Sequence, residues 1–218
     1  MEKHRILDAL KEKDNAVLIE LLETAYNEMN TNQRRAVFGT FAQKMPSPMI
    51  DGEELLGDIE VFYKESLAGV YYAPFNVNSK NYMDIPEETN EWFEQLGDYL
   101  ERSRQLSQQG NHRLAIQCFG VLHKLIDVME DGEEIVFADE LGSWMIPIDE
   151  KPCLHAYIMS LSAISTPEDF TTAAIPLLRR DSYDSLANKV YPTIKKIANK
   201  AQQEAIDMEI ARQNIRIT

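Results

Sequence analysis

The stretch NHRLAIQCFGVLHKLIDVME, residues 111–130, decides the fold class. Its apolar side chains recur at steps of three and four residues, which is the period of one buried face of an α-helix. The same pattern returns along most of the chain, and strand-like alternation is scarce. Because most connections are short, we predict an all-α fold of stacked antiparallel helical hairpins. The apolar positions of this stretch are Leu114, Cys118, Val121, Leu122, Leu125 and Met129.

Short polar residues, prolines and glycines mark where the helices begin and end. Thr166-Pro167-Glu168-Asp169 combines a capping hydroxyl, a proline in the first turn and two acids. Pro176 and Pro192 are expected to kink or break the late helices. The predicted helices cover residues 3–12, 15–29, 31–44, 51–70, 87–108, 112–130, 151–164, 167–180, 184–191 and 193–211.

We predict a single domain over residues 1–218, interrupted by two irregular segments at 71–86 and 131–150. Neither segment shows a sustained helical period, and both are longer than the connections elsewhere. A chain of 218 residues can bury a full core within one domain.

The hairpin over residues 96–129 places a small side chain before two larger ones. Gly110-Asn111 stands at the inter-helix turn, Ala115 at the small packing position, and Phe119 and Leu122 at the next apolar positions. A small residue lets two helices approach, and an aromatic ring fills the groove beside it. In this pattern QQGNHRLAIQCFGVL resembles the second helix of a tetratricopeptide repeat. The resemblance implies a stack of α-hairpins used for protein contacts.

The charge of the chain is concentrated in its middle. The net charge is −14, and residues 46–178 carry seven bases and 24 acids. Such a field repels phosphate backbones and anionic lipids, so we expect neither nucleic acid nor a membrane as partner. Residues 179–218 are net basic, with eight bases and five acids.

The first 14 residues and the longest apolar runs indicate where the protein resides. Charges interrupt the apolar residues of MEKHRILDALKEKD, which therefore lacks the apolar core of a secretory signal. No apolar run reaches the length of about 18 residues that crosses a bilayer. We predict a cytoplasmic protein, in which Cys118 and Cys153 are buried free thiols.

Known reaction and cofactor motifs do not match. Asp127, Asp131 and Gly132 fit three positions of a helix-flanked calcium loop, but Met129 and Ala138 stand where two oxygen ligands belong. The sequence therefore predicts no cofactor, no metal and no catalytic residue.

Four histidines leave one enzymatic alternative open. His112, His123 and Asp127 project to similar angles on one helix, as part of a dispersed metal or acid–base site would. We expect a solvated helix surface there instead, because the stripe lies opposite the apolar face. His155, within PCLHAYIM, is expected to be a hydrogen-bonded core histidine.

Aromatic residues gather in the segment 71–86. Tyr71, Tyr72, Phe75 and Tyr82 precede or join a polar, turn-rich run. One interpretation is core packing at a helix end. The other is a protein-binding surface, in which tyrosines give broad contact and keep a hydrogen-bonding tip.

The segment MEDGEEIVFADELGSWMIPIDE, residues 129–150, is rich in acids and contains no base. Gly132 is expected to end the preceding helix in a left-handed conformation. Ile135-Val136-Phe137 and Leu141 are spaced to reach inward, and we predict that they seal the gap before the helix near Pro152.

Trp144 and Met145 in this segment have two interpretations. Both could belong to the core, since a large exposed apolar patch favours aggregation. Alternatively, Trp144 is an anchor with a rim of acids, suited to a partner with a basic surface around an apolar pocket. The acids of that rim are Asp139, Glu140, Asp149 and Glu150.

These observations favour a non-enzymatic, helical-repeat-like protein that binds another, unidentified protein. An all-α enzyme with a dispersed His, Asp and Glu metal site is one alternative. A self-associating structural protein, a homodimer, is the other, through a narrow C-terminal stripe. That stripe consists of Ile194, Ile197, Ala198, Ala201, Ala205 and Met208.

Overall fold

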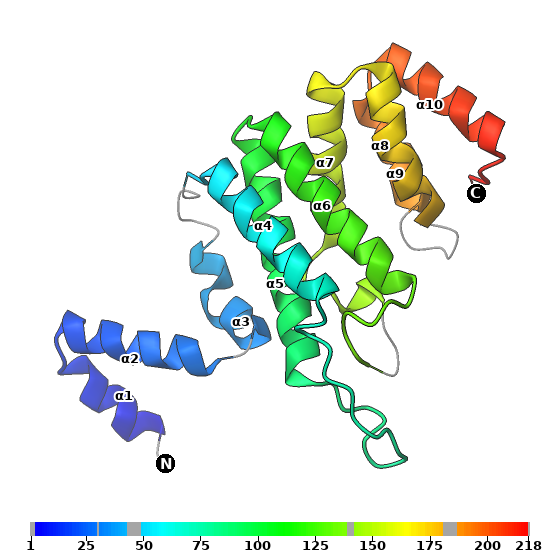
Figure 1. Cartoon of the computed structure of the whole chain (residues 1–218). Helices are drawn as coiled ribbons and strands as arrows, with labels where there is room; N and C mark the ends of the chain where they lie inside the picture. Colours follow the sequence, from blue (N-terminus) through cyan, green and yellow to red (C-terminus); the bar gives the residue numbers. More distant parts are fainter. Residues whose placement is uncertain (1–2, 30, 43–48, 139–141, 181–186, 218) are drawn as a thin grey trace. The chain divides into compact units, whose positions relative to one another are not determined.

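The computed structural model describes residues 3–29, 31–42, 49–138, 142–180 and 187–217 (Figure 1). Within these ranges the chain forms α-helices joined by turns and loops, without β-strands, which confirms the all-α prediction. The elements are α1 (Lys3–Lys11), α2 (Asn15–Glu28), α3 (Thr31–Ala42), α4 (Gly52–Leu67), α5 (Glu87–Gln108), α6 (His112–Glu130), the 3-10 turn η1 (Ser143–Met145), α7 (Glu150–Ile164), α8 (Pro167–Arg180), α9 (Ala187–Ile197) and α10 (Lys200–Gln213).

By their internal contacts, the residues fall into two compact units, 1–47 and 48–218. In the first unit, Asp14 caps α2 by accepting a hydrogen bond from the Val17 N–H at 3.0 Å. Arg34 of α3 donates to the Tyr26 carbonyl at 2.9 Å, and its guanidinium lies 4.8 Å from the centre of the Tyr26 ring. The single domain over residues 1–218 stays a prediction.

The second unit has its core where α4, α5, α6 and α7 pack together. Trp92 of α5 is its largest fully buried side chain. The indole N–H of Trp92 donates to the Ser66 hydroxyl at 2.8 Å, and Ser66 donates to the Phe62 carbonyl at 2.7 Å. This relay satisfies the polar groups that accompany the aromatic cluster into the core.

The predicted hairpin over residues 96–129 forms from α5 and α6, which pack against each other. Ala115 and Phe119 are fully buried, as the packing argument requires. Gly110 closes the turn with φ +83°, a left-handed conformation that costs other residues more than glycine. The resemblance to a tetratricopeptide repeat stays a prediction.

The predicted helix boundary at Pro192 is wrong, because α9 continues through Pro192. Pro176 lies inside α8, within the helix predicted over residues 167–180. The late helices separate instead at Ala198 and Asn199. The Asn199 side chain accepts from the Gln202 N–H at 3.0 Å, and the Gln202 side chain accepts from the Asn199 N–H at 3.1 Å. A proline removes one backbone donor, whereas this capping box supplies partners for two.

The predicted C-terminal apolar stripe is also wrong as a single face. Ile194 and Ala198 are buried, but Met208 is 74% exposed and Ile206 is fully buried in its place. The break at Asn199 restarts the helix with a different face inward. On that face, Gln202 donates to the carbonyls of Ser162 and Ser165.

No described helix combines the length and the apolar character that crossing a bilayer requires. The cytoplasmic location stays a prediction.

Cys118 and Cys153 are both buried and free, as predicted. Burial raises the pKa of Cys118 to about 11 and that of Cys153 to about 12. Both thiols are therefore protonated, and weakly nucleophilic, at neutral pH.

A disulfide reagent that releases a coloured thiolate tests this burial. At pH 8 we expect the native protein to react only as fast as it opens, and the unfolded protein to react at once at both thiols. Since the folded pKa values are raised, the unfolded state loses protons first, so stability falls as the pH rises above about 8.5. A rapid stoichiometric reaction in the native protein would contradict the burial.

Candidate functional site

The two irregular segments are joined through Phe137. The Thr89 hydroxyl, in the first turn of α5, donates to the Phe137 carbonyl at 2.8 Å and accepts from the Phe137 N–H at 3.2 Å. Thr89 is fully buried. One hydroxyl thus satisfies both backbone groups of Phe137 and ties the segment 131–138 to α5. We call this pair of hydrogen bonds the Thr89 clamp.

The ring of Phe137 brings the segment 71–86 to the same place. The ring centres of Tyr72 and Phe75 lie 6.0 and 5.3 Å from that of Phe137, both in edge-to-face geometry. Ile135 and Val136 are buried beside it and Phe137 is half-buried, as the inward prediction requires. Leu141 lies outside the described residues.

Tyr71 lies in the core rather than at the surface. Its ring meets Phe62 edge-on at 5.6 Å, and its hydroxyl lies 3.4 Å from the Gln95 side-chain oxygen. Burial raises the pKa of Tyr71. Tyr72 and Phe75 are half-buried against Phe137, so Tyr82 is the exposed member of the four predicted aromatic candidates.

The segment 71–86, here called the arm, extends as a long loop beyond the ends of α4 and α5 (Figure 1). Asparagine side chains shape its tip. The Asn81 amide accepts from the Asn78 N–H at 2.6 Å and donates to the Asn76 carbonyl at 2.9 Å. Asn78 in turn accepts from the Lys80 N–H at 2.9 Å. The arm exposes the apolar side chains of Val77, Tyr82, Met83 and Ile85.

Residues 142–149, here called the strap, lie against α5 at Gly97. A Cβ atom at Gly97 would come within 3.2 Å of the Pro147 Cδ and 3.3 Å of the Ile148 Cγ2. Glycine therefore permits the strap to approach the helix backbone. Ile146, two residues after Trp144, is buried.

Trp144 stands in η1 with its side chain 70% exposed. The interpretation of Trp144 as a core residue is therefore wrong. Its indole lies over Gly142, where a Cβ atom would come within 2.7 Å of the Trp144 Cδ1. Met145 is half-buried. Of the predicted acidic rim, Asp139 and Glu140 lie outside the described residues, Asp149 is exposed, and Glu150 is half-buried and lines a cavity.

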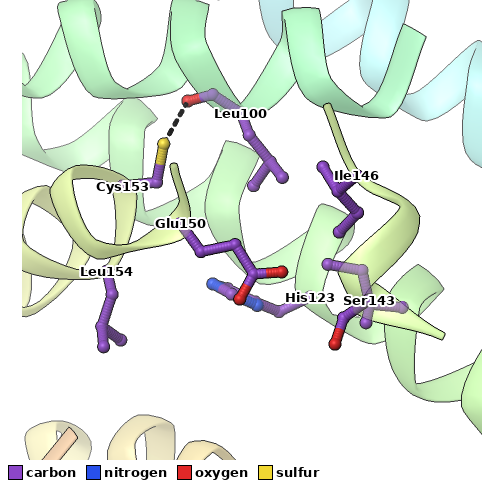
Figure 2. Close-up of a pocket in the computed structure, with 8 residues that line it drawn as sticks. Leu100, His123, Ser143, Ile146, Glu150, Cys153 and Leu154 are labelled. Atoms are coloured by element: carbon purple, nitrogen blue, oxygen red, sulfur yellow. Dashed lines mark hydrogen bonds between the residues drawn. The ribbon is translucent and has the colours of Figure 1, made fainter. Parts of the chain in front are cut away.

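A small cavity of about 20 Å³ lies beneath the strap, which is room for roughly one water molecule. Figure 2 shows His123 of α6 and Glu150 of α7 reaching it together with Ser143 of the strap. On its α5 side, the Cys153 thiol donates to the Leu100 carbonyl at 3.7 Å. The cavity is lined by Leu100, His123, Ile126, Ser143, Ile146, Glu150, Cys153 and Leu154.

The histidines do not lie where the sequence placed them. His112 and His123 are half-buried, because α7 packs on their side of α6, so the predicted solvated surface is wrong. The His112 Nδ1 lies 3.2 Å from the Ser160 hydroxyl, and the His123 ring stacks on Tyr157 with centres 5.3 Å apart. His155, predicted in the core, is exposed.

Groups of three or more metal-capable side chains are absent from the part of the chain that the structure describes. The charge of the residues around the strap is instead carried by separate exposed acids, whereas the arm also carries the exposed base Lys80. Asp131, Glu133 and Glu134 are exposed after α6, and Glu87 and Glu88 are exposed in the first turn of α5. The sequence contains no Lys or Arg between Lys124 and Lys151. This part of the surface is therefore strongly acidic.

No protein-family model matches the chain, and neither a curated protein nor a solved structure is significantly similar to it.

Thr89, Gly97 and Gly142, which position Phe137 and the strap, were not predicted from the sequence. Gly97 carried a readable signal, since an isolated glycine inside a helical pattern often marks a close approach. Thr89 carried none, because a buried threonine in a first helical turn looks like any polar residue there.

Replacing Thr89 by Val tests the clamp. The two side chains have nearly the same shape, so the change removes both hydrogen bonds and leaves the Phe137 backbone groups buried without them. We expect the free energy of unfolding, measured by denaturant titration, to fall by about 1–3 kcal/mol.

Thr172→Val is the matched control. The exposed Thr172 hydroxyl bonds only within its own helix, to the Glu168 carbonyl at 2.9 Å, so the unfolding free energy should change by less than about 0.5 kcal/mol. Equal effects of the two substitutions would show that the clamp adds nothing to stability.

Proposed function

We propose that this chain is a non-enzymatic protein-binding protein that offers Trp144 as an anchor to a partner. The partner carries an apolar pocket surrounded by Lys or Arg side chains. The observation that carries the proposal is the 70% exposure of Trp144 on a segment that is itself fixed to the core.

The fixed backbone matters because it lowers the cost of binding. Flexible segments lose conformational freedom when they bind, and that loss subtracts from affinity. Here the Thr89 clamp precedes Trp144 and the Gly97 contact follows it. The Gly97 contact holds the strap that carries the indole, and exposed large aromatic side chains dominate many protein interfaces.

The surrounding charge supports a basic partner. Glu133, Glu134 and Asp149 are exposed on the same segment as Trp144. Carboxylates around an apolar anchor steer a positively charged surface toward it and repel acidic proteins. The effect weakens with salt, because the Debye length falls from about 10 Å at 0.1 M to about 3 Å at 1 M.

The arm provides a second apolar contact. Tyr82 and Met83 are exposed beyond the asparagine-shaped tip. Met is unbranched and adapts to irregular surfaces, and Tyr combines a broad ring with a hydroxyl. We propose that the arm contributes affinity beside the Trp144 anchor.

The cavity beneath the strap is too small to serve as an active site. His123 and Glu150 both reach it, as an acid–base pair would. Its volume of about 20 Å³ leaves no room for a substrate beside them.

The experiment compares partner capture by the wild type and by Trp144→Ala. Proteins retained from the native host are identified, and the leading candidate is purified and titrated. We expect Trp144→Ala to weaken binding at least about tenfold, as loss of a central anchor does. The melting temperature should stay unchanged, because the indole is exposed.

Val61→Ala is the matched control. Val61 is an exposed apolar residue on α4, so its truncation should leave both binding and melting unchanged. Partner binding that Trp144→Ala leaves intact, or that does not weaken between about 0.1 and 1 M salt, would contradict the proposal.

A further inference from the structure

A groove of about 530 Å³ lies between α8 and α10, on parts of the molecule that the proposed partner site does not use. The two helices run in the same direction. Near their beginnings, the Gln202 side chain donates to the Ser165 carbonyl at 3.1 Å, and near their ends Arg179 donates to the Gln213 side chain at 2.6 Å.

The two walls of the groove follow the same helical spacing. Each wall consists of residues at positions i, i+3, i+4, i+7 and i+8, which form one stripe about two turns long. A valley between two parallel stripes accepts the ridge of a further helix. The walls are Glu168, Thr171, Thr172, Ile175 and Pro176 from α8, and Ala205, Met208, Glu209, Arg212 and Gln213 from α10.

Charge differs between the two ends of the groove. Glu168 lies at the end where α8 begins, with Asp169 exposed beside it. Arg179 and Arg212 lie at the other end. Between the ends stands Met208, which is 74% exposed.

We propose that the groove is filled by a second copy of this chain. In a two-fold assembly the two α10 helices pack antiparallel, and Met208 of each copy enters the groove of the other. Arg212 of one copy then lies opposite Glu168 of its partner, because antiparallel pairing sets the basic end of one groove against the acidic end of the other.

The distribution of charge favours a second copy at this place. Residues 46–178 have a net charge of −17, so two copies repel each other over most of their surface. α10 itself is nearly neutral, with the bases Lys200 and Arg212 against the acids Glu204, Asp207 and Glu209. Pairing through α10 therefore avoids the strongest repulsion, and a groove with unlike ends is complementary to itself when reversed.

The size of the contact sets its strength. α10 has 14 residues, a length of about 21 Å. A contact between two helix pairs of that length is at the low end of specific protein interfaces. We therefore expect a monomer–dimer equilibrium that depends on concentration rather than a permanent dimer.

Sedimentation equilibrium of the full chain, over about 1 μM to 1 mM, tests the pairing. We expect the wild type to dimerise and Met208→Glu to raise the dimer dissociation constant at least about tenfold. The matched control is Met83→Glu on the arm, since Met83 is 76% exposed. The control should leave the constant unchanged.

Charge exchange tests the antiparallel geometry. Glu168→Lys and Arg212→Glu should each weaken the dimer, and the double variant should restore it. Arg212 also forms an ion pair with Glu209 in its own chain. Arg212→Glu removes this pair in the single variant and in the double variant alike. Recovery of the dimer in the double variant therefore reports the contact between copies. Melting curves confirm that each variant is folded.

Three results would overturn the inference. The wild type could stay monomeric over the whole concentration range. Met208→Glu and Met83→Glu could change the dimer dissociation constant equally, or the double variant could dimerise no more tightly than the single variants. None of these results bears on Trp144, so this inference and the proposed function fail separately.

Discussion

The attachment of residues 135–138 and 142–148 to α5 is the constraint on which the candidate surface depends. Thr89 holds the backbone of Phe137, and Gly97, two turns further along α5, lets Pro147 rest on the helix. Eight helical residues span about 12 Å. Between the two points Ile146 turns into the core and Trp144 turns outward. The same attachment brings the arm into place, because the ring of Phe137 packs against Tyr72 and Phe75 at its base.

The acids of this region oppose helix stability but fit a binding role. Asp131, Glu133 and Glu134 follow the C-terminal end of α6, where the helix dipole favours cations. Each such charge costs up to about 1 kcal/mol when exposed. Gly132, with φ +84°, ends the helix in the left-handed conformation that sequence reasoning expected. The basic partner proposed above would be attracted by these acids despite this cost.

Local sequence patterns predicted the helix bounds well, but they did not predict which helices pack against each other. The bounds of α5 and α6 follow from apolar spacing and from Gly110, all of which act within a few residues. The environment of His123 could not be predicted, because periodicity shows that a helix has faces but not that α7 covers a second one. The Asn199–Gln202 capping box could have been recognised in the sequence. It separates α9 from α10, the boundary that had been predicted at Pro192. The exposure of Trp144 depends on Thr89 and Gly97, which lie about 50 residues away in the sequence.

Acrylamide quenching of tryptophan fluorescence tests the central claim most directly, that Trp144 is exposed to solvent. Trp92 is fully buried, so the difference between wild type and Trp144→Phe isolates the emission of Trp144. A neutral quencher is needed, because the surrounding acids repel iodide. The account predicts a red-shifted, readily quenched component that disappears in Trp144→Phe, with an unchanged melting curve. A blue-shifted component that acrylamide does not reach would place Trp144 in the core and contradict the account.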